Sequence, residues 1–146
     1  MWPVQSEPSI QNGPGFTFPT LKNGRYSTSG FEKSVIAHFV MLVRPKVIVE
    51  LGVFEALTTQ FLCELVASNG IPTKIYGFDL PEVIEKIRRT NEKIEAFEKD
   101  GLLRLVPGCL PVSLEKWLKM EQPEIGIAIV DATHDYPSVL GELNLL

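Results

Sequence analysis

Residues 46–59 read KVIVELGVFEALTT and decide the fold expected for this chain. The run of Val and Ile favours a buried strand, and it stops at Glu50, two positions before Gly52. From Leu57 onward the apolar residues recur at helical spacing. A strand, an acid, a glycine and a helix in direct succession are typical of the first unit of an α/β sheet.

The same order of strand and helix recurs along the rest of the chain. The patterns predict helices at 31–42, 57–68, 81–99, 110–120 and 136–146, and strands at 46–51, 74–80, 102–108 and 124–131. The strands are almost continuously apolar, which indicates that helices cover both faces. We therefore predict an α/β fold: a doubly wound, mostly parallel, Rossmann-like sheet of about four strands over residues 31–146.

Residues 1–30 differ from the rest because they are dense in Pro, Gly, Ser and Asn and show neither helical nor strand periodicity. We expect a flexible N-terminal arm, which could fold over a ligand as a lid or cover a partner subunit. The first helix follows it, with Ser29 as N-cap and Glu32 in its first turn. His38 in this helix is interpreted as a structural residue.

The composition of the chain limits its partners. With 146 residues, 45% of them hydrophobic, the chain fits one domain. A net charge of -4 argues against a broad grip on nucleic acid or an anionic membrane. No apolar run reaches the ~18 residues of a membrane span, and the start lacks a secretion signal, so we expect a cytoplasmic protein. Cys63 and Cys109 lack metal or disulfide spacing and are interpreted as core thiols.

Three acids follow apolar strands: Glu50, Asp79 and Asp131. The carboxyl ends of parallel strands meet at one edge of a sheet, where α/β proteins bind ligands. Carboxylates at that edge can accept hydrogen bonds from ligand hydroxyls or pair with an ammonium group. Asp79 closes the second strand, where a nucleotide site holds both ribose hydroxyls, and Gly52 lets the backbone turn close to a ligand.

At these motifs the chain resembles the class I S-adenosylmethionine-dependent methyltransferases. VIVELGVFEA matches their first motif and departs from it at Ala56, where the family usually has a second Gly. The ends of the family's second, third and fourth strands are matched by IYGFD, LLRLVPG and IGIAIVD, respectively. The run VDATHDYPSVLGEL, residues 130–143, is similar to a signature of O-methyltransferases that act on sugars and small natural products.

The resemblance implies S-adenosylmethionine as cofactor and methyl transfer to a small-molecule hydroxyl acceptor. Glu50 and Gly52 would face the methionine part, Asp79 the ribose and Leu80 the adenine, and Asp131 with His134 would form the reaction centre. Phe54 and Gly108 complete the implied cofactor contacts. His134 is the better base because an imidazole titrates near neutral pH, and Asp131 with Asp135 could hold a divalent metal.

Other interpretations remain open. Glu50 could be a solvated strand end, Gly52 a plain turn residue, Asp79 a cap of the helix at Pro81 and His134 an ordinary loop residue. The family sheet has seven strands, and strands five to seven are missing here. The chain could therefore be a truncated enzyme, a compact variant completed by dimerisation, or a degenerate, non-catalytic cofactor-binding module.

The fourth strand would leave an apolar edge uncovered, which leads us to expect a homodimer through that strand or the last helix. A nicotinamide-dependent reductase is less favoured. The loop has one Gly in place of G-x-G-x-x-G, and its Glu would repel a phosphate.

Overall fold

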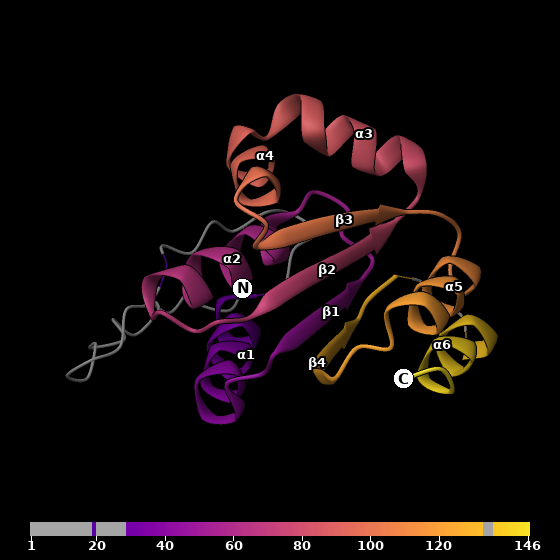
Figure 1. Ribbon diagram of the computed structural model, residues 1–146, viewed down its shortest axis with the longest axis horizontal. Coiled ribbons are helices and arrows are strands. Elements are labelled where there is room, and N and C mark those ends of the chain that lie inside the picture. The colour runs from indigo at the N-terminus through magenta and orange to yellow at the C-terminus, as the bar shows by residue number, and fades with distance from the viewer. Residues whose placement is uncertain (1–18, 20–28, 133–135) are drawn as a thin grey trace, which may run out of the picture.

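Four parallel strands form one sheet in the order β3-β2-β1-β4 (Figure 1). This computed structural model describes residues 19, 29–132 and 136–146. The strands are β1 (Val47–Leu51), β2 (Lys74–Asp79), β3 (Leu103–Pro107) and β4 (Ile125–Val130). In the central strand, Leu51 pairs with Phe78 of β2 and with Val130 of β4, so three strands end at the same level.

Helices cover both faces of this sheet. They are α1 (Gly30–Val43), α2 (Leu57–Ser68), α3 (Pro81–Thr90), α4 (Glu92–Lys99), α5 (Val112–Glu121) and α6 (Tyr136–Leu143). The first four pack on one face, while α5 and the residues after α6 pack on the other (Figure 1). The doubly wound α/β fold expected from the sequence is confirmed. No helix in the described residues has the length and apolar character that would span a membrane.

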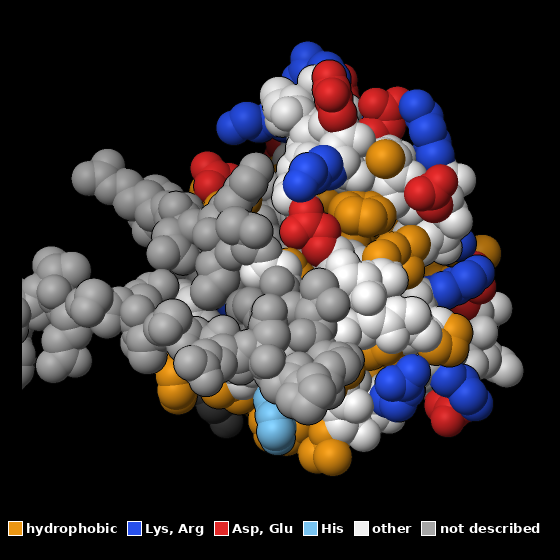
Figure 2. All heavy atoms as spheres, turned by 90° about the vertical axis from the view of Figure 1, so that its left-hand side faces the viewer, with side chains coloured by type: hydrophobic (Ala, Val, Ile, Leu, Met, Phe, Trp, Pro, Cys, Tyr) orange, Lys and Arg blue, Asp and Glu red, His pale blue; other side chains and the backbone are white. Residues whose placement is uncertain are grey.

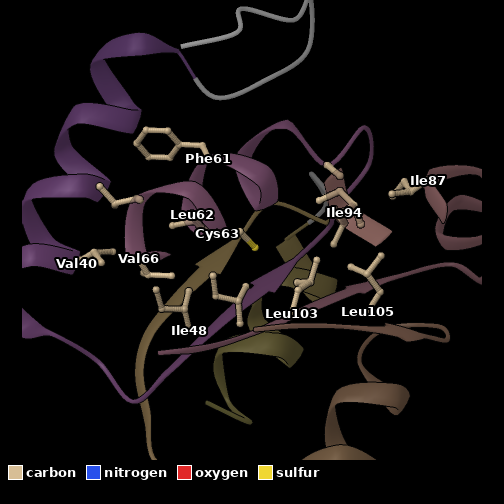
Figure 3. Packing of buried hydrophobic residues seen from close by; sticks show 14 of the residues in the cluster. Val40, Ile48, Phe61, Leu62, Cys63, Val66, Ile87, Ile94, Leu103 and Leu105 are labelled. Carbon is tan, nitrogen blue, oxygen red and sulfur yellow. The ribbon is translucent and has the colours of Figure 1, made fainter. Parts of the chain in front are cut away.

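The larger core lies between the sheet and α1 to α4 (Figure 3). Ile48 and Ile75 from the central strands are fully buried against Leu62 and Val66 of α2 and Val40 of α1. Such buried aliphatic side chains each contribute about 1.5–3 kcal/mol. Packing in this core holds α2 behind the end of β1. It thereby fixes the position of the turn that joins β1 to α2.

The smaller core lies on the opposite face. Trp117 of α5 packs on the sheet, with its ring centroid 4.6 Å from that of Tyr76 and 5.3 Å from that of Phe78. The other fully buried residues of this cluster are Val49, Leu51 and Leu114. β1 and β2 are therefore buried on both faces, as their continuous apolar sequences predict.

The helix expected at 81–99 is in fact two helices, so that prediction is wrong in this detail. Asn91 has an extended backbone, with φ -130° and ψ 91°, and its side chain accepts a hydrogen bond from the Ile94 N–H at 3.2 Å. Asn is a favoured N-cap because its side chain satisfies a free N–H at a helix start. The break lets α4 turn back toward β3.

The two cysteines lie in different surroundings. Cys63 in α2 is buried, as expected for a core thiol. Cys109 is exposed in the turn between β3 and α5, so its interpretation as a core thiol is wrong. The absence of disulfide or metal spacing does not by itself show that a thiol is buried.

The two outer strands of the sheet have different edges. On β3, Glu98 of α4 accepts the Leu105 N–H at 3.0 Å, and Arg88 of α3 donates to the Leu105 carbonyl at 3.3 Å. The same two side chains form a two-bond ion pair, so they cap the free edge as another strand would. No strand in the described part of the chain pairs with the outer edge of β4.

Residues 1–18 and 20–28 lie outside the described residues. The expected arm and its role as a lid therefore stay predictions.

Candidate functional site

The site expected from the sequence lies at the carboxyl ends of the strands, here called the rim. The backbone closes this edge with three hydrogen bonds: Gly52 N–H to the Phe78 carbonyl at 2.9 Å, Asp131 N–H to the Leu51 carbonyl at 2.9 Å, and Gly108 N–H to the Asp79 carbonyl at 3.0 Å. These bonds hold the residues that follow all four strands side by side. Glu50, Asp79 and Asp131 consequently lie along one edge of the sheet.

Glu50 is buried, with 3% of its surface exposed. Its carboxyl accepts a hydrogen bond from the Thr59 hydroxyl of α2 at 2.5 Å. Burial raises the pKa of Glu50 to about 8; the Thr59 bond opposes this rise, and the negative charges of Asp131 and Asp79 add to it. Glu50 therefore holds a proton at neutral pH. The interpretation of Glu50 as a solvated strand end is wrong, because α2 covers it.

The electrostatic effect of Asp131 and Asp79 on Glu50 agrees with their placement along one edge of the sheet. Two carboxylates influence a third only when they lie near it, and the influence is strongest across a poorly solvated interior. Asp131 and Asp79 both act on Glu50 in this way. The rim therefore concentrates acidic groups, and a ligand cation would find a favourable potential there.

Gly52 makes the turn after β1 possible. Its φ is 91°, a left-handed conformation that side chains disfavour. A Cβ at this position would lie 2.5 Å from the Ala132 Cα and 2.6 Å from the Asp131 carbonyl oxygen. Gly52 is therefore more than a plain turn residue, since the loop after β1 and the loop after β4 touch through it.

The loop between β1 and α2 contains two further left-handed residues. Phe54 has φ 50° and Ala56 has φ 61°, although neither is Gly. Each such residue costs roughly 1–2 kcal/mol, a strain that often marks functional loops. Ala56 is fully buried at the N-cap of α2 and caps the helix with no side-chain hydrogen bond. It occupies the position where the resembled family has its second Gly.

Asp79 holds this loop in place. One carboxylate oxygen, Oδ2, accepts the N–H groups of Val53 at 2.9 Å and Phe54 at 2.8 Å, and the other, Oδ1, accepts the Leu80 N–H at 2.7 Å. Charge-assisted bonds of this kind are about twice as strong as neutral ones. Asp79 is not the N-cap of α3, because Leu80 takes that position and has no side-chain cap. Asp79 instead joins the ends of β1 and β2.

The remaining expected cofactor residues surround Asp79. Leu80 is 40% exposed and Phe54 is 55% exposed, so both offer apolar surface next to its carboxylate. Gly108 has φ 154°, and a Cβ there would lie 2.7 Å from the Ser113 Cβ. A glycine is therefore required where the chain leaves β3 and enters α5.

Asp131 is exposed at the end of β4. His134 and Asp135 lie outside the described residues, so the expected reaction centre and metal site stay predictions. Within residues 29–132 and 136–146, no three His, Cys, Asp or Glu side chains gather closely enough to hold a metal ion.

A groove with a volume of about 350 Å³ borders the rim loop. It is lined by Phe54 and Glu55 of the loop, Leu57 of α2, and Val83, Lys86 and Ile87 of α3. A second cavity of about 330 Å³ lies at the opposite, amino ends of β2 and β3, beside Lys74 and Leu103. The first of these is the one that touches a residue expected to bind the cofactor.

Sequence reasoning missed two residues of the site. Thr59 bonds Glu50, and Val53 packs on Gly77, where a Cβ would lie 2.7 Å from the Val53 Cγ2. The polar run Thr58-Thr59-Gln60, all buried in α2, was a usable signal, because buried polar side chains need partners. The contact between Val53 and Gly77 joins residues far apart in the sequence and carries no local signal.

Comparison with known proteins agrees with this fold. A family model described as "Methyltransferase domain" matches residues 49–146, from β1 through α6. The chain therefore belongs to the methyltransferase domain family, which confirms the resemblance found in the motifs. A search of curated protein sequences gives no match.

Solved structures share the fold. An O-methyltransferase from Bacillus cereus in complex with SAH is 16% identical, with 75% of this chain covered, 47% of that chain covered and a TM-score of 0.60. TomG, an O-methyltransferase from Streptomyces achromogenes in complex with SAM, is 14% identical, with 82% of this chain covered, 52% of that chain covered and a TM-score of 0.61. CmcI with Mg and SAM is 20% identical, with 92% of this chain covered, 56% of that chain covered and a TM-score of 0.59. This chain spans about half the length of these structures.

Proposed function

We propose that the chain binds S-adenosylmethionine at the rim and takes part in methyl transfer to a hydroxyl group of a small-molecule acceptor. One observation carries the proposal: Glu50 and Asp79, the acids expected at the methionine and ribose positions, converge at one sheet edge beside a glycine-dependent turn. Family membership and the SAM or SAH named for structures of this fold support the same cofactor.

The residues at the rim fit an adenosyl ligand. A carboxylate accepts about four hydrogen bonds, and three N–H groups reach Asp79, so its Oδ1 can accept a ribose hydroxyl as well. Leu80 and Phe54 offer apolar surface for an adenine ring on either side. Gly108 follows β3 at the same rim, and its N–H bonds the Asp79 carbonyl at 3.0 Å, so it lies beside the proposed ribose site.

Glu50 fits the ammonium group of the methionine part. A nearby positive charge stabilises the ionised carboxylate, so cofactor binding would lower the raised pKa of Glu50 and release its proton. A protonated Glu50 in the free chain avoids burying an unpaired charge. The site would thus become charged only when the ligand provides the opposite charge.

Bound S-adenosylmethionine supplies an activated methyl group on its sulfonium. The chain must align the acceptor and remove the hydroxyl proton. We assign proton removal to His134 and alignment of the acceptor to Asp131, with Asp131 and Asp135 as ligands if a divalent cation takes part. The net charge of -4 supports a small-molecule acceptor over a nucleic acid. We also keep a cytoplasmic location and a homodimer within this proposal.

A cofactor-binding module without turnover is the second candidate. The observation that favours it is Ala56: its methyl group stands in the loop where a second Gly is usual, and the residue is strained at φ 61°. A nicotinamide-dependent reductase is less favoured, because acidic groups converge where a pyrophosphate would need N–H donors.

Calorimetric titration with S-adenosylmethionine, S-adenosylhomocysteine (SAH) and NAD separates these candidates. We expect both adenosyl ligands to bind and NAD to give no heat of binding. Binding of NAD alone would favour the reductase, and no binding by any of the three would contradict the proposed cofactor. If SAH binds, a second assay uses S-adenosylmethionine with a labelled methyl group and a panel of phenols and sugars as acceptors. Transfer of the label to an acceptor distinguishes the enzyme from the module without turnover.

A further inference from the structure

Thr59 is a buried polar residue that reaches from α2 to the end of β1. Its side chain lies in the first turn of the helix, none of its surface is exposed, and its hydroxyl donates to Oε2 of Glu50 at 2.5 Å. The loop that joins the two elements contains three residues with positive φ, at Gly52, Phe54 and Ala56. This bend brings the start of α2 back over the end of β1.

The side chain of Thr59 does not stabilise the start of its own helix. Thr59 is the third residue of α2, and at the same position of α1 Glu32 accepts the backbone N–H of the N-cap Ser29 at 2.7 Å. Helix α2 has no such cap, since its N-cap Ala56 makes no side-chain hydrogen bond. Side-chain caps stabilise helices. A polar side chain that bonds Glu50 in place of its own helix therefore indicates a role at the strand end.

The other groups near Glu50 do not replace Thr59. Cys63, one turn further along α2, points toward the sheet (Figure 3), and burial, followed by the charge of Glu50, raises the pKa of its thiol. Asp79 and Asp131 act on Glu50 as like charges. Among the described residues, Thr59 is the only one that donates a hydrogen bond to Glu50. It is therefore the group that favours the ionised form of this carboxyl.

The bond from Thr59 leaves half of the Glu50 carboxyl group for a ligand. It occupies Oε2 only, and no described residue donates to Oε1. Thr is β-branched, so a buried Thr side chain has few rotamers and its hydroxyl stays in place. The terminal torsion of Glu is broad, and the bond from Thr59 restricts it. Because Oε1 then points in one direction, a ligand that binds there loses less freedom.

We propose that Thr59 is a positioning residue, whose hydroxyl orients the carboxyl group of Glu50 so that Oε1 receives the ammonium group of the methionine part of the cofactor. The inference rests on the proposed cofactor and adds a residue to its site. When Glu50 is ionised, the bond from Thr59 becomes charge-assisted and about twice as strong as a neutral one. Thr59 thus supports the charged form that the ammonium needs, without touching the ligand.

The first test removes the hydroxyl and keeps the shape of the side chain. Thr59→Val should weaken SAH binding, measured by calorimetry, by about tenfold or more, as expected for a hydrogen bond to a charged group. Thr59→Ser keeps the donor but is less restricted in its rotamers, so its affinity should return to within about threefold of wild type. Unchanged SAH affinity in Thr59→Val would overturn the inference.

The second test shows which part of the ligand depends on Thr59. Methylthioadenosine has the adenosine and the sulfur of SAH but lacks the amino acid part, so it has no ammonium group for Glu50. Thr59→Val should bind methylthioadenosine as tightly as the wild-type chain does, which also shows that the variant is folded. Equal losses for SAH and methylthioadenosine would show that Thr59 shapes the site as a whole, and would overturn the inference.

The matched control lies at the amino ends of the strands. Thr73 is also a buried threonine, 3% exposed, and its hydroxyl donates to the Pro45 carbonyl at 2.6 Å. Thr73→Val removes a buried hydrogen bond, so it should lower the melting temperature. The affinity for both ligands should stay unchanged, because Thr73 lies at the opposite end of the sheet from the rim.

A second control lies on the surface of the same side. The strands in Figure 1 point to the right, so Figure 2, which faces the left-hand side of that view, shows the molecule from their amino ends. The pale-blue histidine at its lower edge is His38, because His134 lies outside the described residues. His38 is exposed, so it is not a packed core residue as the sequence led us to expect. His38→Gln should change neither ligand affinity nor melting temperature.

The third test determines whether Thr59 acts through Glu50. In a Glu50→Gln background the partner of the ammonium is already lost, so adding Thr59→Val should weaken SAH binding by no more than about twofold. The same loss in both backgrounds would give Thr59 a role independent of Glu50 and would overturn the inference. A wild-type chain that binds neither SAH nor methylthioadenosine would contradict the proposed cofactor itself, and the inference with it.

Discussion

Glu50 and Asp79 are acids at the ends of neighbouring strands, yet the protein treats them in opposite ways. Glu50 is buried beneath α2, bonds the Thr59 hydroxyl and has a pKa raised to about 8, mainly by burial. Asp79 is partly exposed and accepts three backbone N–H groups. The position of an acid at a strand end therefore determines where its carboxyl group lies. The groups around the carboxyl determine its charge and its role.

Because of this difference, Asp79 and Glu50 have separate roles at the rim. Asp79 provides a fixed negative charge that holds the Val53–Phe54 backbone and has room for another hydrogen bond. Glu50 provides a carboxyl whose proton can leave when a cation arrives. Gly52 lies between these two groups, so changes at three neighbouring positions should have separable effects.

The largest effect is expected at Gly52. Gly52→Ala places a Cβ 2.5 Å from backbone in the loop after β4 and should lower the free energy of unfolding by about 3–5 kcal/mol. Gly70→Ala is the control, because Gly70 also has a positive φ, 59°, but open space around it, and should cost only about 1 kcal/mol. Urea denaturation compares the two. Equal losses would show that conformational strain alone, and not the contact between loops, requires Gly52.

Asp79→Asn should have the next largest effect. The amide keeps the shape but replaces one acceptor oxygen with a donor, so a backbone N–H loses its partner and stability falls by about 2 kcal/mol. SAH binding should be lost as well. Glu82→Gln, an exposed acid at the start of α3, is the matched control and should change neither quantity. Normal SAH affinity in Asp79→Asn would remove Asp79 from the proposed ribose site.

Glu50 predicts an unusual dependence of stability on pH. Its pKa is raised from 4.5 to about 8 by folding, so the folded chain holds a proton that the unfolded chain releases between these values. The Glu50 contribution is therefore complete below pH 4.5 and is lost as pH rises through 8, with a slope of up to about 1.4 kcal/mol per pH unit. Urea denaturation across this range should show the decrease in the wild-type chain, and Glu50→Gln should flatten it. An unchanged slope in the variant would assign the effect to another group.

The smallest effect is expected at Ala56. Ala56→Gly relieves a left-handed residue at φ 61°, but it adds freedom to the unfolded chain, so we expect a gain of at most about 1 kcal/mol. If SAH binds more tightly in the same variant, the Ala56 methyl group also narrows the cofactor site. A loss of stability would show that packing of this buried methyl outweighs the strain.

Sequence reasoning succeeded where local pattern and topology act together. Continuous apolar strands alternating with helices predict the parallel sheet, and the shared edge then places Glu50, Asp79 and Asp131 near one another. The reasoning failed where long-range packing decides. The polar run at 58–60 indicates that a buried partner exists, but it does not show that this partner is Glu50 or that α2 buries it. The apolar spacing of Phe31, Phe39 and Leu42 predicts a helix without showing that these side chains face away from the core.

Polar residues inside helices were the second source of error. Asn91 is one polar residue among many in the segment 81–99, so the pattern does not single it out. Its side chain, however, accepts the free Ile94 N–H and so starts a new helix. The opposite case is Ser29, where the cap was predictable because Glu32 follows at the spacing of a capping box.

SAH titration in two buffers of different ionisation enthalpy, at neutral pH, tests the central claim most directly. The account predicts that the wild-type chain releases close to one proton when SAH binds, because the ligand ammonium pairs with Glu50, and that Glu50→Gln binds SAH without this release. Identical proton release in both proteins, or no binding of SAH by the wild-type chain, would contradict it.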